Sequence, residues 1–283
     1  MIPAPNTPEW LAFRKGKITA SKIPIIMGES PYRTAYQLWQ EEKGLIPPQQ
    51  SMPHMKKGNE IEDEARLYFF TSKKIEVFPE TIIHPENPLF MASVDGISED
   101  KSVIVEIKFN NISTHADVLV GIIPLFHVIQ MQWQMYVTGL NSCWYLSYRF
   151  NIECMIEVKR DDNLIEKMVD AAHAFLRCLD DGIPPPLTDR DYIDKSGDIL
   201  LQSIIINYRH HMEMVNYHSD RMEEYRRQIL AIADEKPCKG EGWKVSKVVT
   251  KGRVDYDAIP ELKGVKVDQY RKPETVSYRI TIE

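Results

Sequence analysis

The 283-residue sequence lacks several features that would assign a protein to a particular class. No run of apolar residues approaches the ~20 needed to span a bilayer. The first six residues contain no basic region followed by an apolar stretch, so no secretory signal is predicted. The 4 cysteines stand far apart without a Cys-x-x-Cys pair, which argues against a zinc site and a disulfide framework. A cytoplasmic protein is therefore expected.

An excess of basic charge is also missing. The formal net charge is −6, which is atypical of a nucleic-acid-binding protein. Residues 237–283 nevertheless hold 10 Lys and Arg against 7 Asp and Glu, a local charge of +3 that leaves −9 for the rest. Because affinity for phosphates depends on local charge, the negative net charge does not exclude a basic DNA-binding channel in this protein.

The clearest chemical pattern is Ser93-Val94-Asp95-Gly96 followed by a strand over residues 103–109. Period-two alternation places Glu106 and Lys108 on one face of this strand and four apolar residues on the other, which is expected to be core. The Asp-Gly pair predicts a turn that brings Asp95 near them. Two carboxylates can hold Mg²⁺ or Mn²⁺ and a water, and an ammonium can orient that water. An exposed Glu/Lys pair on a surface strand is the alternative.

Residues 14–22 pack four basic groups and two hydroxyls into nine positions. Arg14 can fork onto phosphate oxygens and Ser21 can donate to them. A solvated helix end with Ser21 as its N-cap would have the same composition.

Two predicted helices carry further candidates. In a helix over about 55–72, Glu62 lies beside the apolar stripe, where it can reach a metal or pair with Arg66 at i,i+4. In a helix over 126–137, Gln130 can bond to the water or a metal ligand, or form part of an exposed amide edge.

The chain is expected to contain three parts. Gly182 and the three prolines at 184–186 end a core of residues 1–187. Residues 188–236 form a long coiled-coil-like helix, and residues 237–283 form a small β-rich extension with strands over 243–249, 254–256 and 276–282. Whether the helix pairs within or between subunits is open. Its apolar seam recurs at spacings of 3 and 4: Leu201, Ile204, Tyr208, His211, Val215, His218, Met222, Tyr225, Ile229 and Ile232.

Together these motifs resemble the lambda-exonuclease/YqaJ group of phage recombination nucleases, which have the PD-(D/E)xK restriction-endonuclease-like fold. The resemblance covers about residues 8–180. Val94 stands where the family usually has proline before the metal-binding aspartate. The matching motifs are Trp10-x3-Arg14-x4-Thr19-Ala20-Ser21, Gly58-x3-Glu62-x2-Ala65-Arg66, Ser93-Val94-Asp95-Gly96, Glu106-Ile107-Lys108 and Gln130-Met131-Gln132.

The resemblance implies an α/β fold with a central mixed sheet flanked by helices. It implies that Asp95, Glu106 and the Ile107 carbonyl bind one Mg²⁺ or Mn²⁺ ion and that Glu62 helps to bind a second. Lys108 would activate the attacking water.

The remaining implied site residues serve the water and the DNA. Gln130 would lie beside Lys108, Arg14 and Ser21 would hold the 5′-phosphate, and Ser93 would lie close to the scissile group.

The resemblance also implies an activity and partners. Family members digest the 5′ strand of linear duplex DNA and leave a 3′ overhang for a single-strand annealing protein, and some form a ring-shaped trimer. The alternatives are an endonuclease on the same fold and a non-catalytic recombination scaffold. Arg14 and Ser21 favour recognition of DNA ends, and the intact trio of Asp95, Glu106 and Lys108 argues against the scaffold.

Overall fold

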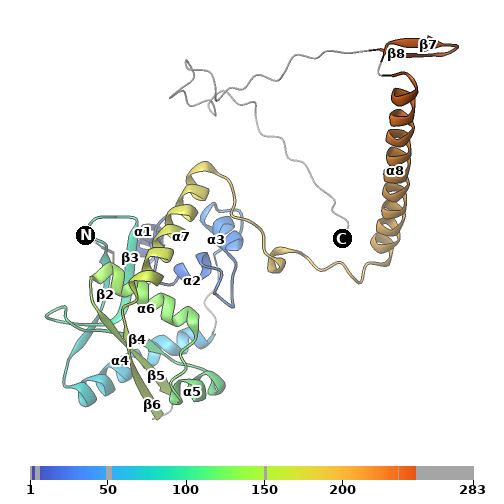
Figure 1. Cartoon of the computed structure of the whole chain (residues 1–283). Coiled ribbons are helices and arrows are strands. Elements are labelled where there is room, and N and C mark those ends of the chain that lie inside the picture. Colours follow the sequence, from blue (N-terminus) through green and yellow to red (C-terminus); the bar gives the residue numbers. More distant parts are fainter. Residues whose placement is uncertain (1, 4–6, 49–52, 150–151, 235, 247–283) are drawn as a thin grey trace, which may run out of the picture. The chain divides into compact units, whose positions relative to one another are not determined.

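The computed structural model describes residues 2–3, 7–48, 53–149, 152–234 and 236–246 (Figure 1). The chain divides into two compact units, Met1–Ile193 and Asp194–Glu283, each described here by itself. The tail strands expected over 254–256 and 276–282 lie outside the described residues. The division into three parts stays a prediction.

A mixed sheet forms the centre of the first unit. Its strand order is β1-β3-β4-β5-β6, with β2 paired to β3. The β1–β3 and β4–β5 pairs are parallel and the others antiparallel. This confirms the predicted fold class. The strands are β1 (Ile18–Thr19), β2 (Val77–Ile83), β3 (Phe90–Ser98), β4 (Ile104–Lys108), β5 (Ser142–Arg149) and β6 (Ile152–Lys159).

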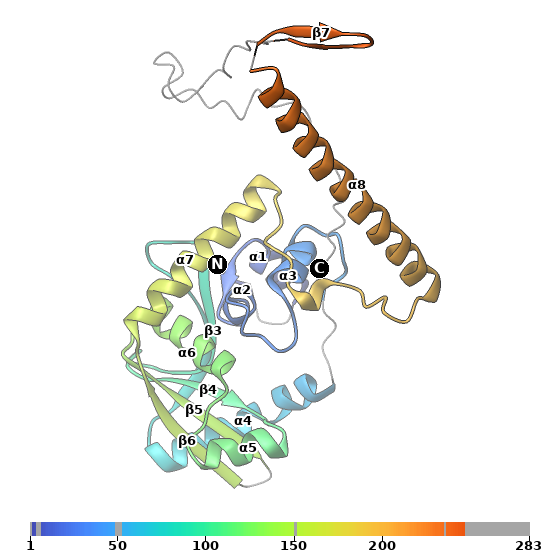
Figure 2. The same ribbon diagram turned by 45° about the vertical axis from the view of Figure 1, so that its right-hand side comes forward.

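Helices cover both faces of this sheet (Figures 1 and 2). One apolar cluster joins α4 to β4 and β5, and another joins α6 to β3, β4 and β5 on the opposite face. The helices are α1 (Pro8–Arg14), α2 (Ile23–Ile26), α3 (Ala35–Glu42), α4 (Pro53–Lys73), α5 (Ile112–Leu119), α6 (Leu125–Thr138) and α7 (Asp162–Asp181), followed by the short 3₁₀ helix η1 (Asp189–Asp191).

The expectation of a single buried face on β4 was wrong. On one face, Val105 and Ile107 pack against α4, whereas Ile104 on the other packs against α6. The reason is topological: β4 lies between β3 and β5, and helices cover it on both sides. Glu106 is therefore fully buried rather than displayed at a surface.

Asp95 and Gly96 lie inside β3 and not in the turn that their sequence predicts. Val77 of β2 lies so close to Gly96 that its Cγ2 would be 2.7 Å from a Cβ at position 96. Only glycine therefore fits at this position of β3. Strand β2 is continuous, and its register with β3 shifts between Phe78 and Glu80. Pro79 has no N–H to donate, which explains the irregularity.

The first unit continues past the proline-rich segment because η1 docks on the loop before α3. Arg190 donates to the carbonyls of Ser30 at 2.8 Å and Pro31 at 3.0 Å, and Thr34 donates to Asp191.

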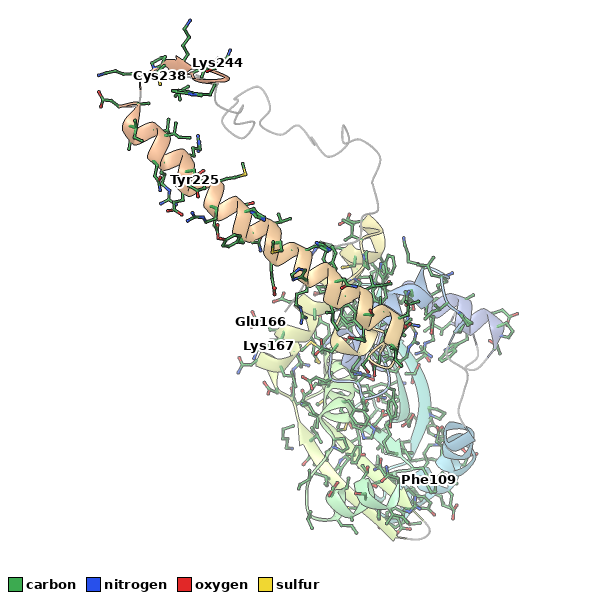
Figure 3. All side chains as sticks on the ribbon, turned by 90° about the vertical axis from the view of Figure 1, so that its right-hand side faces the viewer. Phe109, Glu166, Lys167, Tyr225, Cys238 and Lys244 are labelled. Atoms are coloured by element: carbon green, nitrogen blue, oxygen red, sulfur yellow. The ribbon has the colours of Figure 1, made fainter. Side chains whose placement is uncertain are left out.

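The second unit contains helix α8 (Ile199–Ile232) and a hairpin of β7 (Cys238–Gly240) and β8 (Trp243–Val245) (Figure 3). The Asp198 side chain caps α8 by accepting from the Leu201 N–H at 3.0 Å. No residue of α8 is buried, so the predicted seam is uncovered along the helix. Among the described residues, no helix is long and apolar enough to cross a membrane.

Candidate active site

Glu106 is the buried centre of the candidate site. It lies on β4 with no exposed surface, and its carboxylate is surrounded by donors. Oε1 contacts the Lys108 Nζ and accepts from Gln130 Nε2 at 2.5 Å, and Oε2 accepts from Gln134 Nε2. A charge-assisted network of this kind fixes the direction of a buried carboxylate.

Asp95 faces this group from β3. Its Oδ2 accepts from the Ile107 N–H at 2.7 Å, which ties β3 to β4 next to Glu106. Burial raises the pKa of Asp95 well above its ordinary value, and the carboxylates of Glu106 and Glu62 raise it further. The three acids therefore lie within electrostatic reach of one another.

Glu62 joins the group from α4 through Arg66. Arg66 Nη1 donates to the Asp95 carbonyl at 2.9 Å and lies 3.6 Å from Glu62 Oε2. Burial raises the pKa of Glu62, and Arg66 and Lys108 oppose that rise. The Glu62–Arg66 ion pair, which the sequence offered as an alternative to metal binding by Glu62, is thus part of the same cluster as Asp95. Sequence reasoning missed the link from Arg66 to Asp95 because it joins residues 29 apart.

The donor set fits a hard divalent cation. Glu62, Asp95 and Glu106 offer oxygen ligands, and a bound cation would offset the repulsion that raises the pKa of Asp95. Among the described residues, no three acidic, His or Cys side chains already converge into a complete metal site. Burial alone would lower the pKa of Lys108, but Glu106 and Asp95 raise it above its ordinary value, so its ammonium keeps its proton.

Arg14 and Ser21 come together as their spacing suggested. Arg14 Nη2 donates to Thr19 Oγ1 at 3.2 Å and to Ser21 Oγ at 3.1 Å, and its guanidinium lies 4.2 Å from the ring centre of Trp10. Ser21 does not cap α2, whose N-cap is Lys22. A guanidinium held between an aromatic ring and two hydroxyls is a preorganised anion-binding group.

A second basic group supports this cluster. Lys22 forms a 2.5 Å ion pair with Glu42 of α3, and the other Glu42 oxygen accepts from the Gly16 N–H at 2.8 Å. Burial lowers the pKa of Arg14, and Glu42 opposes that shift. The part played by Glu42 has no local sequence signal, because α3 begins well after the basic cluster.

Ser93 and Gln130, two of the predicted site residues, make contacts that the sequence did not fully predict. Ser93 hydrogen-bonds to Thr81 Oγ1 of β2 at 3.0 Å, so its described side-chain contact is with the outer strand and not with Arg14 or Ser21. Gln130 contacts Glu106, but Gln134 does so as well, and sequence reasoning missed it. The i,i+4 spacing of the two glutamines was the signal that could have revealed the second.

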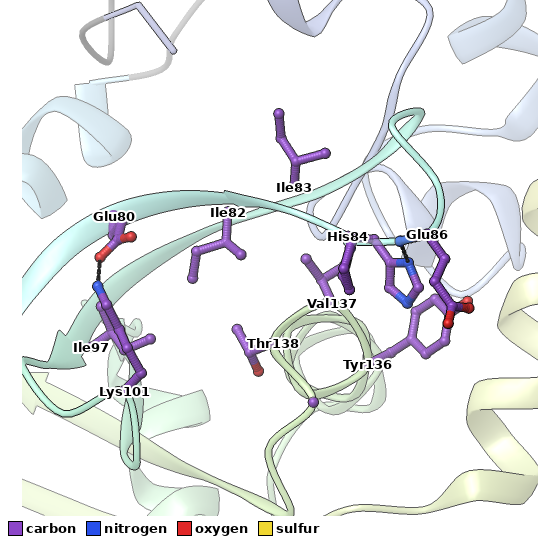
Figure 4. Close-up of a pocket in the computed structure, with 12 residues that line it drawn as sticks. Glu80, Ile82, Ile83, His84, Glu86, Ile97, Lys101, Tyr136, Val137 and Thr138 are labelled. Atoms are coloured by element: carbon purple, nitrogen blue, oxygen red, sulfur yellow. Dashed lines mark hydrogen bonds and ion pairs between the residues drawn. The ribbon is translucent and has the colours of Figure 1, made fainter. Parts of the chain in front are cut away.

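A cavity of about 460 Å³ lies elsewhere, between β2 and the end of α6 (Figure 4). Its wall includes His84, which stacks on Tyr136 with ring centres 4.6 Å apart and accepts from the Glu86 N–H at 3.2 Å. None of the predicted site residues lines this cavity. It is therefore not the place where the chemistry is expected.

Known proteins share both the sequence and the fold of this region. The YqaJ-like viral recombinase domain matches residues 9–141. An alkaline exonuclease from Laribacter hongkongensis, LHK-Exo, is 31% identical, with a TM-score of 0.55, over 62% of this chain and 94% of that chain. The chain belongs to the lambda-exonuclease/YqaJ family.

Two curated relatives have lower sequence identity. The uncharacterized protein YqaJ of Bacillus subtilis is 26% identical over 59% of this chain and 54% of its own length. The uncharacterized protein R354 of Acanthamoeba polyphaga mimivirus is 24% identical over 76% of this chain and 44% of its own length. The chain thus spans about half the length of these curated relatives. A structure of LHK-Exo in complex with dAMP matches to a similar degree, at 30% identity and a TM-score of 0.55.

This YqaJ-family chain also buries a histidine next to the site. Burial and, to a smaller extent, the positive charge of Lys108 together lower the pKa of His127 to about 3. Its Nδ1 lies 2.8 Å from the Tyr145 hydroxyl. His127 is therefore neutral in the folded protein at any pH near neutrality.

The free energy of unfolding is expected to decrease as the pH is lowered, because His127 takes up a proton more readily in the unfolded chain than in the folded protein. Unfolded His127 takes up a proton near pH 6.5 and the folded residue only near pH 3, so the unfolded state binds the extra proton between these values. Each pH unit below about 6 then costs about 1.4 kcal/mol. Denaturant unfolding at pH 8 to 5 should show this extra loss in the wild type relative to His127→Gln. Identical pH dependence in the two proteins would contradict the assignment.

Proposed function

We propose that this protein is a metal-dependent deoxyribonuclease that degrades linear double-stranded DNA from its 5′ ends and leaves 3′ overhangs. The observation that carries the proposal is the buried Glu106 carboxylate, held against Lys108 and opposite Asp95. Membership of a family that includes the exonuclease LHK-Exo supports it. Mg²⁺ or Mn²⁺, as two ions, is the proposed cofactor.

Each residue of the site has a distinct task in this proposal. Asp95, Glu106, Glu62 and the Ile107 carbonyl would hold the metal, which would polarise a phosphate oxygen and lower the pKa of a bound water. Lys108 orients that water and offsets the negative charge that builds on the phosphate. The glutamines of α6 fix the direction of Glu106, and Gln130 is the one proposed to lie beside the water.

Recognition of an end is assigned to the cluster around Arg14. Its guanidinium can fork onto two oxygens of a terminal phosphate, and Ser21 can donate to a third. Ser93, on a strand that also carries Asp95, is proposed to approach the scissile group after exchanging its contact with Thr81. An endonuclease on the same fold is the alternative, because the metal chemistry alone does not require an end.

Labelled linear duplexes and a closed circle together distinguish a 5′-to-3′ exonuclease from an endonuclease. With Mg²⁺, a linear duplex should lose label from a 5′ end at once and from a 3′ end only late, while a covalently closed circle stays intact. The proposed reason is that the Arg14 cluster binds the 5′-terminal phosphate and so directs the first phosphodiester of that strand to the metal. Early loss of a 3′ label would reverse the polarity, and cutting of the closed circle would favour the endonuclease.

We further propose that α8 joins copies of this chain and that the 3′ overhang is passed to a single-strand annealing protein. The ten seam positions run the length of α8, and among them Ile204, Val215 and Met222 are more than half exposed. A helix with such a seam gains stability by packing against an equivalent helix.

Light scattering after gel filtration tests the association through α8. The wild type is expected to elute as an oligomer, and Val215→Glu is expected to shift its mass to that of one chain because a charge in the seam resists burial. Gln202→Glu puts the same carboxylate outside the seam of the same helix and should leave the mass unchanged. A monomeric wild type, or equal masses for all three proteins, would contradict the pairing between copies.

A further inference from the structure

A chain of buried polar groups lies on the same sheet face as Lys108, between the ends of β4 and β5 and the helices α5 and α6. Asn110 Nδ2 donates to the Tyr145 hydroxyl and to Ser147 Oγ, both at 2.9 Å. Beyond them, His127 Nδ1 lies 2.8 Å from the Tyr145 hydroxyl and His115 Nδ1 lies 2.7 Å from Ser147 Oγ. All five residues are buried.

Counting donors fixes the direction of these hydrogen bonds. The Asn110 amide nitrogen can only donate, so each hydroxyl accepts from it and has one proton of its own to give. Neither proton is left unpaired if Tyr145 donates to His127 and Ser147 donates to His115. The two histidines then both act as acceptors, one at each end of the network, and they differ in that the Nε2 of His115 is buried without a hydrogen-bond partner among the described residues.

The histidines at the two ends of this network face different charges. The parallel register pairs Glu106 with Tyr145 and Lys108 with Ser147, so these side chains share one face of the sheet. The charge of Lys108 acts on His127, whereas the charges that act on His115 belong to Arg149 and Glu153. The two histidines therefore differ in what they face while making the same kind of bond.

We propose that His127 is a positioning residue for the hydrolysis: by accepting the Tyr145 proton, it fixes the Tyr145 ring beside Glu106 and thereby the direction of the Lys108 ammonium. Lysine has a flexible four-carbon side chain, and a long cation is useful in catalysis only when its surroundings fix its direction. Asn110 holds the same hydroxyl from the other side. This inference rests on the proposed nuclease function.

Two substitutions at His127 test whether its role depends on accepting the Tyr145 hydrogen bond or on the imidazole ring itself. His127→Leu leaves the Tyr145 proton without an acceptor and is expected to lower kcat about 10- to 100-fold, the usual effect of losing a supporting hydrogen bond around a metal site. KM for DNA ends should not change, because the Arg14 cluster is untouched. His127→Gln offers Oε1 to the same proton and should restore kcat to within a few-fold of the wild type.

A double variant tests whether the Tyr145 ring must be held. Tyr145→Phe with His127→Leu removes the hydroxyl that His127→Leu leaves without an acceptor, but one N–H of Asn110 then loses its own acceptor, so Tm should stay close to that of His127→Leu. The rate should not recover, because the ring is no longer held.

His115→Leu provides the matched control, since it removes the equivalent acceptor from Ser147. It is expected to lower Tm and to leave kcat at the wild-type value. Wild-type kcat in the double variant, or equal losses of kcat in His115→Leu and His127→Leu, would overturn the inference while leaving the proposed function intact. Absence of hydrolysis by the wild type in the same assay would overturn both.

Discussion

Lys108→Ala is expected to reduce turnover on linear duplex DNA about 100- to 1,000-fold while leaving the affinity for DNA ends within a few-fold of the wild type. The ammonium of Lys108 contacts Glu106, and its charge also acts on Asp95. Its removal takes away the cation that offsets charge on the reacting phosphate. The cluster around Arg14, which is proposed to bind DNA ends, belongs to other elements and is unchanged.

Single-turnover release of nucleotides measures the first effect, and binding of a labelled duplex in Ca²⁺ measures the second. Lys101→Ala is the matched control, because Lys101 also pairs with a glutamate, Glu80, but at an exposed position. Such a surface pair contributes little, so its loss should leave turnover unchanged. Unchanged cleavage by Lys108→Ala would remove the catalytic assignment.

Arg14→Ala is expected to abolish the preference of the enzyme for 5′-phosphoryl over 5′-hydroxyl ends. Hydrogen bonds to charged groups contribute about 1.5–3 kcal/mol, so the wild type should favour the phosphorylated end about 10- to 100-fold. The Arg14 guanidinium is held in place by Trp10, Thr19 and Ser21 and would bind the terminal phosphate through two parallel bonds. Degradation rates of two duplexes that differ only in the 5′ group measure this ratio.

Arg14→Lys and Arg226→Ala make this prediction specific. Arg14→Lys keeps the charge but loses the fork, and should retain only part of the preference. Arg226 lies exposed on α8 in an ion pair with Glu223, and its loss should leave the ratio unchanged. A wild-type ratio in Arg14→Ala would place the 5′-phosphate elsewhere.

Local patterns carried the sequence prediction furthest. Thr7 caps α1 and Pro8 stands at the first position of this helix, a signal that involves only neighbouring residues. The seam of α8 also follows from local spacing. The errors came from long-range packing: Gly96 is required by Val77 of another strand, and the second buried face of β4 depends on which helices cover the sheet.

The same distinction applies to the candidate site. Period-two alternation was enough to put Glu106 and Lys108 on one face, and the structure gathers Asp95 and Glu62 around them. Local spacing could not reveal that Arg66 reaches Asp95 or that Glu42 supports the Arg14 cluster, because these contacts join separate elements. The roles of the individual residues stay predictions until variants are measured.

Metal-dependent hydrolysis of a linear duplex by the wild type and by Asp95→Ala tests most directly whether Asp95, Glu106 and Lys108 form the active site. The wild type is expected to release nucleotides in Mg²⁺ and none in EDTA, and Asp95→Ala is expected to release none, with both proteins unfolding cooperatively. Equal release by the two proteins, or release that does not depend on a divalent metal, would contradict the assignment of Asp95, Glu106 and Lys108 as the active site.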